Sequence, residues 1–356
     1  MRVIYDPRDQ LNLQDYGIFV PVSKDNRKKT MEVLLGSAGV LSPPQWWIQS
    51  LGTSLTKEDL LRVHTPRLVD ALFSGGKALE TELVRTFELI LPDGSYNRYD
   101  PAKAVKPLSD LFDVLLHRGG GTYEACIQAL DCGAGFFLGG GYHHAMADWG
   151  SGFCVFNDAV VAMKKLQAQG LISHGWIVDI DAHKGDGTAA LTLKDPTITT
   201  LSIHMAQGWP LDVSVQEAAN QPGRSELSFE PSTLDIPVEE PDQDRYVELL
   251  DRGLHRLWEA RQGVGTGSVQ DLRGNLRPVV NPDLVFVVMG SDPFEEDELP
   301  SAKLLHLTRE QMHQRDVLVH SFFRERGVPV AYNMAGNYGE NGWKIYSDFL
   351  AWALAY

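Results

Sequence analysis

The stretch HGWIVDIDAHKGDG, residues 174–187, predicts the fold of this chain. It begins as a continuous apolar run and ends in carboxylates and a histidine. Such a run is typical of a strand that is buried on both faces of a parallel sheet. Successive side chains of a strand point to opposite faces, so Asp179, Asp181 and His183 should all face the same way where the strand ends. Asp186 follows three residues later.

Other parts of the chain repeat this design. Apolar runs typical of strands occur at 135–140, 198–204, 283–292 and 328–339, and apolar residues at helical spacing occur at 105–118, 121–132, 157–170 and 308–327. Strands that alternate with helices form a parallel sheet with helices on both faces. The sequence therefore predicts a single α/β domain over residues 1–356.

One segment interrupts the alternation. Residues 261–282 are polar, rich in glycine and without clear periodicity. Because strands and helices resume on both sides of it, we expect a long surface loop within the domain and no linker between domains.

The composition is that of an acidic globular protein, which disfavours several functions. The 356 residues carry a formal net charge of −15, so docking on nucleic acid phosphates is not expected. No apolar run approaches the roughly 20 residues of a membrane span, and the first ten residues lack the apolar segment of a signal peptide. Three cysteines do not make a disulfide framework. We therefore expect a cytoplasmic protein, whose charge serves solubility or attracts a cationic substrate.

Potential metal ligands follow two of the predicted strands. Asp181 and His183 lie at the end of one strand and Asp292 lies just past another. In open parallel sheets, ligands bind at this edge. Two carboxylates and one imidazole leave a coordination position for water, which is the pattern of a catalytic zinc site. Helix capping could explain Asp181 and His183 alone, but not Asp292 as well. The pattern predicts one Zn²⁺ per chain.

A histidine pair supplies candidate acids and bases. His143 and His144 follow a glycine run that closes another predicted strand, and each needs a partner to fix its tautomer. Asp179 and Asp186 are the carboxylates available for this purpose. Tyr338, among small residues past a fourth strand, could donate to a developing oxyanion. We interpret the other histidines as structural: His64, His117, His174, His204, His255, His306, His313 and His320.

These motifs together resemble the zinc-dependent histone deacetylase superfamily, which includes bacterial deacetylase-like amidohydrolases and acetylpolyamine amidohydrolases. The resemblance extends over residues 60–339 and rests on four motifs in order: GGGYHHA, GSGFCVFND, DIDAHKGDGT and GSDPFEEDELPSAKLLHLT. It implies the arginase/deacetylase fold, a parallel sheet of about eight strands between helices. It also implies an amidohydrolase that removes an acetyl or other acyl group from an N-acylated lysine or a similar amine.

The resemblance assigns metal binding, proton transfer and carbonyl polarisation to the residues singled out above, with His144 favoured as the general base and acid and His143 mainly electrostatic. It adds residues that would bind substrate. Asp100 matches an aspartate at the rim that holds the substrate backbone. Gly152 and Phe153 match one wall of an acyl-lysine tunnel, and Trp209 is the favoured residue for the opposite wall.

Two further features follow from the resemblance. A monovalent cation such as K⁺ would bind near the metal site, at Asp179, Asp181, His183 and the backbone around Ser202. Many family members carry a second histidine at the position of Lys184. The form without that histidine is more similar to the class IV branch and its bacterial relatives. Because Lys184 alternates with His183 along the chain, we expect its side chain to point away from the metal.

The sequence leaves alternatives open. The substrate could be an acylated lysine, a peptide or an acetylpolyamine, and iron could replace zinc. The same fold could hold a two-metal ureohydrolase-like centre, or a pocket that binds an acylated partner without catalysis. A serine nucleophile at Ser151 lacks the GxSxG context that it would need. The oligomeric state is not determined by these patterns.

Overall fold

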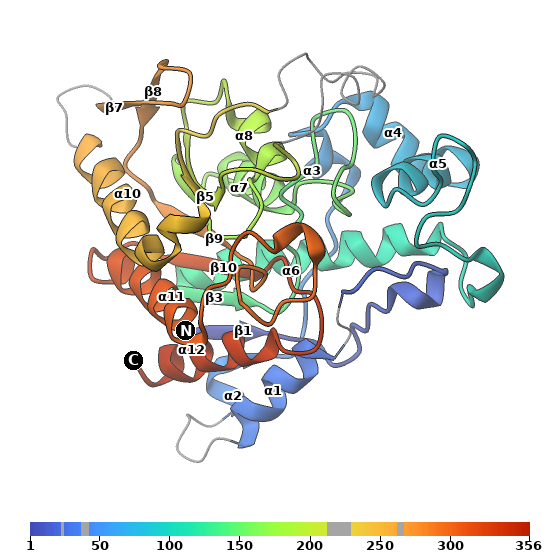
Figure 1. Cartoon of the computed structure of the whole chain (residues 1–356), viewed down its shortest axis with the longest axis horizontal. Coiled ribbons are helices and arrows are strands. Elements are labelled where there is room, and N and C mark those ends of the chain that lie inside the picture. Colours follow the sequence, from blue (N-terminus) through green and yellow to red (C-terminus); the bar gives the residue numbers. More distant parts are fainter. Residues whose placement is uncertain (23–24, 37–42, 212–228, 262–266) are drawn as a thin grey trace.

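Eight parallel strands form one sheet in the computed structural model, which describes residues 1–22, 25–36, 43–211, 229–261 and 267–356 (Figure 1). The order across the sheet is β2–β1–β3–β10–β9–β4–β5–β6. The strands are Arg2–Ile4 (β1), Trp47–Ile48 (β2), Ala134–Phe137 (β3), Gly175–Asp179 (β4), Ile198–Met205 (β5), Leu234–Val238 (β6), Leu284–Met289 (β9) and Val330–Met334 (β10). The predicted parallel α/β fold is confirmed.

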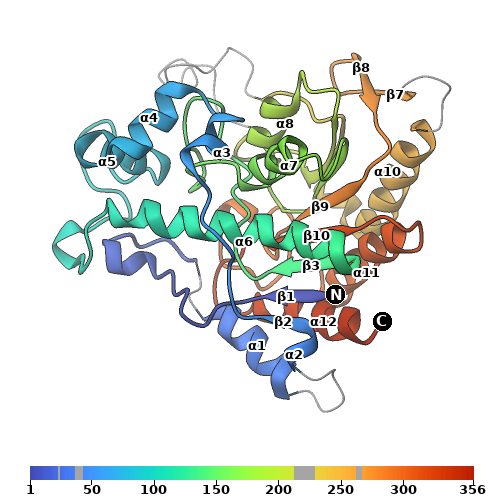
Figure 2. The same cartoon turned by 180° about the vertical axis from the view of Figure 1, so that it is seen from behind.

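Helices cover both faces of the sheet (Figures 1 and 2). One face packs against α1 (Asn26–Gly36), α10 (Tyr246–Ala260), α11 (Arg309–Arg324) and α12 (Trp343–Ala355), and the other against α6 (Asp110–Cys132) and α7 (Asp158–Ala168). The side chains of β4 show why: Trp176 and Val178 join the first core, whereas Ile177 joins the second. No helix within the described ranges is long and apolar enough to cross a membrane.

A third apolar cluster extends the molecule beyond the sheet. The helices α3 (Lys57–Leu61), α4 (Pro66–Ser74) and α5 (Gly76–Thr86) pack against the first half of α6, together with residues from the loop before α7. This cluster contains Phe87, with Phe153 packed against it. Two short helices complete the set: α2 (Pro43–Trp46) and α8 (Asp186–Thr192).

Helix α6 is longer than the sequence predicted, because the two stretches expected at 105–118 and 121–132 form one helix through the glycine run at 119–121. Glycine is a poor helix former, so tertiary packing must explain its presence. A Cβ added at Gly120 would lie 2.2 Å from the carbonyl oxygen of Thr53. The glycines thus let the chain after Leu51 pass directly over the helix.

The segment predicted as a long loop is partly a hairpin. Within 261–282, β7 (Gly267–Gln270) and β8 (Leu276–Val279) pair antiparallel, while 262–266 lie outside the described residues. The Asp271 carboxylate accepts hydrogen bonds from the backbone N–H groups of Arg273 and Asn275, and Gly274 adopts φ = 77°. The strands are too short and too polar to show an alternating pattern, so the loop prediction was wrong there.

The close passage at α6 gives a stability prediction. Gly120→Ala should destabilise the protein by about 1–3 kcal/mol, because backbone atoms of Thr53 must shift. This loss outweighs the roughly 1 kcal/mol by which alanine favours a helix. Urea unfolding measures it. The control is Gly36→Ala at the end of α1, where no atom lies within 4 Å of the added Cβ and no loss is expected. Equal midpoints for wild type and Gly120→Ala would contradict the packing argument.

Candidate metal and catalytic site

The strand order brings the candidate residues to one edge of the sheet. Strands β3, β10, β9 and β4 are consecutive neighbours, and all run in the same direction. The chain segments after these four strands carry, in that order, His143 and His144, Tyr338, Asp292, and Asp181 with His183. Residues almost 200 positions apart in sequence, such as His143 and Tyr338, therefore line one cavity.

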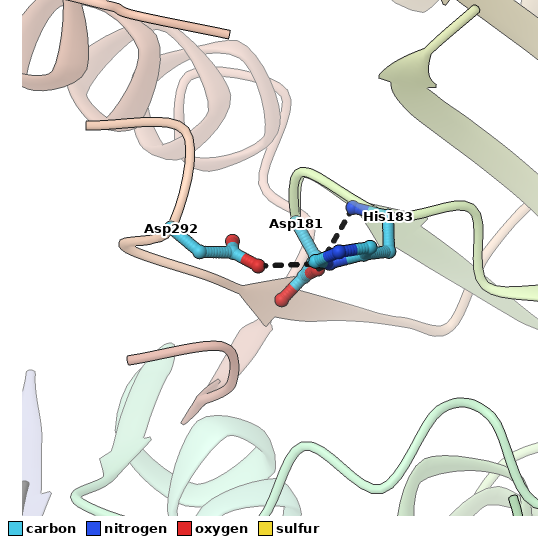
Figure 3. A group of neighbouring side chains, drawn as sticks. All are labelled: Asp181, His183 and Asp292. Atoms are coloured by element: carbon cyan, nitrogen blue, oxygen red, sulfur yellow. Dashed lines mark hydrogen bonds and ion pairs between the residues drawn. The ribbon is translucent and has the colours of Figure 1, made fainter. Parts of the chain in front are cut away.

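Asp181, His183 and Asp292 form a buried group with the donor set of a metal site (Figure 3). One ligand atom from each residue lies within 4.8 Å of the other two. The His183 Nδ1 atom is 3.3 Å from Asp181 Oδ1 and 3.0 Å from Asp292 Oδ2. The other ring nitrogen, Nε2, is 3.2 Å from the Ser301 hydroxyl, which fixes the ring with Nδ1 facing the carboxylates.

Backbone groups hold the two carboxylates in place. The Gly336 N–H donates to Asp181 Oδ2 at 2.8 Å, and the Ala182 N–H donates to Asp292 Oδ1 at 3.0 Å. Glycine is required beside them, since a Cβ at Gly290 or Gly336 would lie within 2.6 Å of oxygens of both carboxylates. Space around the carboxylates is therefore kept by the absence of side chains at these two positions.

The carboxylates create a negative site that stabilises positive charge. Burial alone would lower the pKa of His183, but Asp181 and Asp292 outweigh it and raise that pKa to about 10. Burial and the charge of Asp181 raise the pKa of Asp292 to about 6. A cation bound here would replace the His183 proton, so metal binding should release a proton and weaken at low pH.

The two histidines differ in charge because their surroundings differ. His143 Nδ1 is 2.7 Å from Asp179 Oδ2, and His143 Nε2 is 3.7 Å from Asp181 Oδ1. Burial alone would lower the pKa of His143, but these carboxylates raise it to about 9. His144 Nδ1 is 2.7 Å from Asp186 Oδ1, yet burial and the neighbouring His143 charge lower its pKa to about 4. At neutral pH, His143 is thus charged and His144 is neutral.

A cavity of about 130 Å³ opens onto these groups. Its lining includes His143, His144, Asp181, Tyr338 and Phe153. Burial and the nearby carboxylates keep the pKa of Tyr338 well above its usual range, so its hydroxyl stays protonated. The lining also includes two buried arginines, Arg27 and Arg118, which share the carboxylate of Asp9.

The predicted tunnel walls lie beside the histidines, whereas Asp100 does not. Phe153, with φ = 67°, stacks on Phe87, and a Cβ at Gly152 would touch both His144 and Trp209. The Trp209 ring centroid is 4.5 Å from that of His144. Asp100 accepts a hydrogen bond from the Ala102 N–H and pairs with Lys103, outside the residues that line the cavity. Its role at the rim stays a prediction.

Lys184 points away from the metal-binding group, as expected. Its ammonium group forms a buried ion pair with Asp235 and lies 3.2 Å from the Ser232 hydroxyl. Burial alone would raise the pKa of Asp235, but Lys184 and His204 hold it well below its usual range. His204 itself is 2.7 Å from the Met205 carbonyl oxygen, consistent with a structural role.

Several residues that support the site were not predicted from the sequence. The carboxylate of Asp297 accepts the backbone N–H of Tyr338 at 3.0 Å, and Ser301 contacts His183. Both lie in the polar segment after Asp292. An acidic segment of this kind is typical of a solvent-exposed surface, so it gave no signal for a buried site. His64, taken as structural, bridges the Met146 carbonyl and the Asn157 N–H, and so ties the histidine loop to the start of α7.

Comparisons with known proteins agree with this arrangement. The family model for the histone deacetylase domain matches residues 21–348. The chain belongs to the histone deacetylase family. An uncharacterized protein of Picosynechococcus sp. is 35% identical over 62% of this chain and 62% of its own length. Histone deacetylase 2 of Arabidopsis thaliana is 26% identical over 64% of this chain and 50% of its own length.

The fold also matches solved structures of this family. A histone deacetylase homologue from Aquifex aeolicus superposes with a TM-score of 0.63 at 20% identity, over 99% of this chain and 82% of that one. At this identity the likeness shows the fold alone. The matches to these curated relatives span less than two thirds of the relatives' lengths. The function of this chain is therefore inferred from its own site residues.

The histidine environments can be tested by NMR titration of the imidazoles in metal-free protein. We expect one buried histidine that titrates near pH 9 (His143) and one near pH 4 (His144). Asp179→Asn should lower the pKa of His143 by about 1–3 units, because a neutral amide replaces the anion that stabilises its proton. Asp186→Asn should instead lower the pKa of His144. An unchanged His143 titration in Asp179→Asn would show that another group sets it.

Crowding at the carboxylates gives a second prediction. Gly336→Ala should weaken Zn²⁺ binding at least about tenfold, because the new methyl group would displace both carboxylates. Titration against a competing chelator measures this affinity. Gly175→Ala is the control, since its methyl group would meet the flexible end of Met163 at 3.0 Å, far from the site. Wild-type affinity in Gly336→Ala would argue against these carboxylates as ligands.

Proposed function

We propose that this histone deacetylase family protein is a zinc-dependent hydrolase that removes an acetyl or other acyl group from an N-acylated lysine or a similar amine. One observation carries the proposal: Asp181, from a buried Asp–His–Asp group, lines the same cavity as His143 and His144, each of which is bonded to a carboxylate. General bases and a metal site in one cavity are what metal-assisted amide hydrolysis needs.

The donor set suits zinc. Two carboxylates and one imidazole nitrogen neutralise a divalent ion and leave a coordination position open. A cation held by Asp181, His183 and Asp292 would polarise the amide carbonyl and lower the pKa of an attacking water molecule. A two-metal centre is disfavoured because Asp179 and Asp186, two of the further carboxylates at this edge of the sheet, are bonded to the histidines.

His144 is the residue placed to move protons. Its Nδ1–H donates to Asp186, which leaves Nε2 free to take a proton from water as the oxygen attacks the carbonyl carbon. When the C–N bond breaks, His144 returns that proton to the leaving amine, and a carboxylate and a free amine result. His143, whose Nδ1 is bonded to Asp179, contributes mainly by its electric field.

Tyr338 is placed to stabilise the transition state. Its hydroxyl stays protonated over the working pH range, so it can donate to the carbonyl oxygen as negative charge develops there. Asp297 holds the Tyr338 backbone, and Phe153 with Trp209 would flank an acyl-lysine side chain. An acetylpolyamine would fit the same walls, so lysine and polyamine substrates are tested together below.

A monovalent cation such as K⁺ fits beside the metal site. Ser202 pairs with Asp179 across β5 and β4, and its buried hydroxyl has no hydrogen-bond partner within the residues that the structure describes. An unpaired buried hydroxyl is costly, and a cation that also contacts Asp179 would satisfy it. We include this ion in the proposal.

The proposed function can be tested with a panel of fluorogenic acyl-lysines, from acetyl to long-chain, and with acetylated polyamines. We expect the zinc-loaded protein to hydrolyse at least one of them, and a chelator to abolish turnover. Tyr338→Phe should lower kcat about 10²–10³-fold through loss of the oxyanion donor. Tyr332→Phe, which removes a buried hydroxyl bonded to His320, should not.

The outcomes separate the alternatives. Turnover of polyamines alone would favour an acetylpolyamine amidohydrolase. Zinc binding without turnover on the whole panel would favour a protein that binds acylated partners. Full activity in Tyr338→Phe would mean that another group stabilises the oxyanion.

A further inference from the structure

A buried arginine joins the two chain segments that carry the carboxylate ligands. Arg315, on α11, is fully buried, and its Nη1 atom donates to the carbonyl oxygens of Ile180 and Gly290, both at 2.9 Å. Its Nε donates to Asp316 at 2.7 Å, and its Nη2 lies 2.7 Å from the same oxygen. The guanidinium group is thereby held by its own helix on one side and reaches two strand ends on the other.

The two carbonyl groups belong to the backbone of the metal-binding group. Ile180 directly precedes Asp181, and Gly290 lies two residues before Asp292. Gly290 also lies against both carboxylates, since its Cβ would be 2.4 Å from Asp181 Oδ2 and 2.6 Å from Asp292 Oδ1. A single nitrogen thus bridges the two chain segments just beyond the paired strands β4 and β9, where each segment turns toward its carboxylate.

This contact also carries charge. The carbonyl oxygens of Ile180 and Gly290 point toward the guanidinium group, so a buried cation lies behind the two segments that carry the carboxylates. Burial alone would lower the pKa of Arg315, but Asp316 and Tyr246 raise it, so the group stays charged. Asp316, whose pKa burial raises to about 6, is its main counterion.

We infer that Arg315 is a positioning residue that sets the separation of Asp181 and Asp292 and thereby tunes the affinity of the site for a divalent cation. The inference rests on the proposed metal site but concerns a residue that touches neither metal nor substrate. Groups behind the ligands typically change metal affinity about 10–100-fold when they are removed. A purely structural role in the core would instead lower stability with or without metal.

The test compares two buried arginines. Arg277, on β8, also reaches two backbone carbonyl groups, those of Pro231 and Thr192, and lies near Asp271, but it makes no contact with the metal-binding group. We would prepare Arg315→Met and Arg315→Lys with Arg277→Met and Arg277→Lys as matched controls. Zn²⁺ affinity is measured by chelator competition, and thermal unfolding is followed with and without Zn²⁺.

We expect Arg315→Met to weaken Zn²⁺ binding about 10–100-fold. Arg315→Lys should weaken it less, since lysine keeps the positive charge but cannot contact Asp316 through two nitrogen atoms as arginine does. The rise in Tm on adding Zn²⁺ should shrink in both variants, because it reports affinity for the folded state. The Arg277 variants should lose stability yet keep Zn²⁺ affinity within about twofold. If Arg315→Met does not fold, Arg315→Lys carries the test.

Two results would overturn the inference, and they are distinguishable. If the wild type binds Zn²⁺ and the Arg315 and Arg277 variants shift Tm equally with and without metal, Arg315 is only a core residue, and the proposed function stands. If the wild type binds no Zn²⁺ at all, the proposed metal site itself is wrong, and the inference falls with it.

Discussion

The structure depends on the burial of four carboxylates at one edge of a parallel sheet. Asp179, Asp181, Asp186 and Asp292 are each at most 2% exposed. Isolated buried anions would cost many kcal/mol, so each must be paired. Asp179 and Asp186 are paired with His143 and His144, and the other two face His183.

This electrostatic constraint links the fold to the proposed chemistry. Protons or a cation must balance the negative charge of the carboxylates. The burial and the charged neighbours of each histidine determine which histidine holds a proton. The pKa of His143 is raised because two carboxylates face it, whereas burial and the charge of His143 lower the pKa of His144. Two adjacent imidazoles with the same intrinsic pKa thereby come to differ by several units, which is how one site can contain both a fixed charge and a base.

The sequence predicted the parts of the molecule whose signal is local. Buried strands such as β4 and β9 show continuous apolar runs, and parallel strands bring their carboxyl ends together. The proximity of Asp181, His183 and Asp292 could therefore be predicted from the sequence. The α6 glycines were misread as a break because their reason, the passage of Thr53, lies elsewhere in the chain. Arg315 and Asp297 were missed since each acts through a backbone group 25 or more residues away.

The order of the strands also governs how copies of this chain can meet. At one edge of the sheet β2 has two residues, which offers little backbone for another strand to pair with. At the other edge β6 contains Pro237, which has no N–H to donate. Natural sheets use such short strands and edge prolines to prevent strand addition. Copies of this chain are therefore not expected to join through strand addition to the eight-stranded sheet.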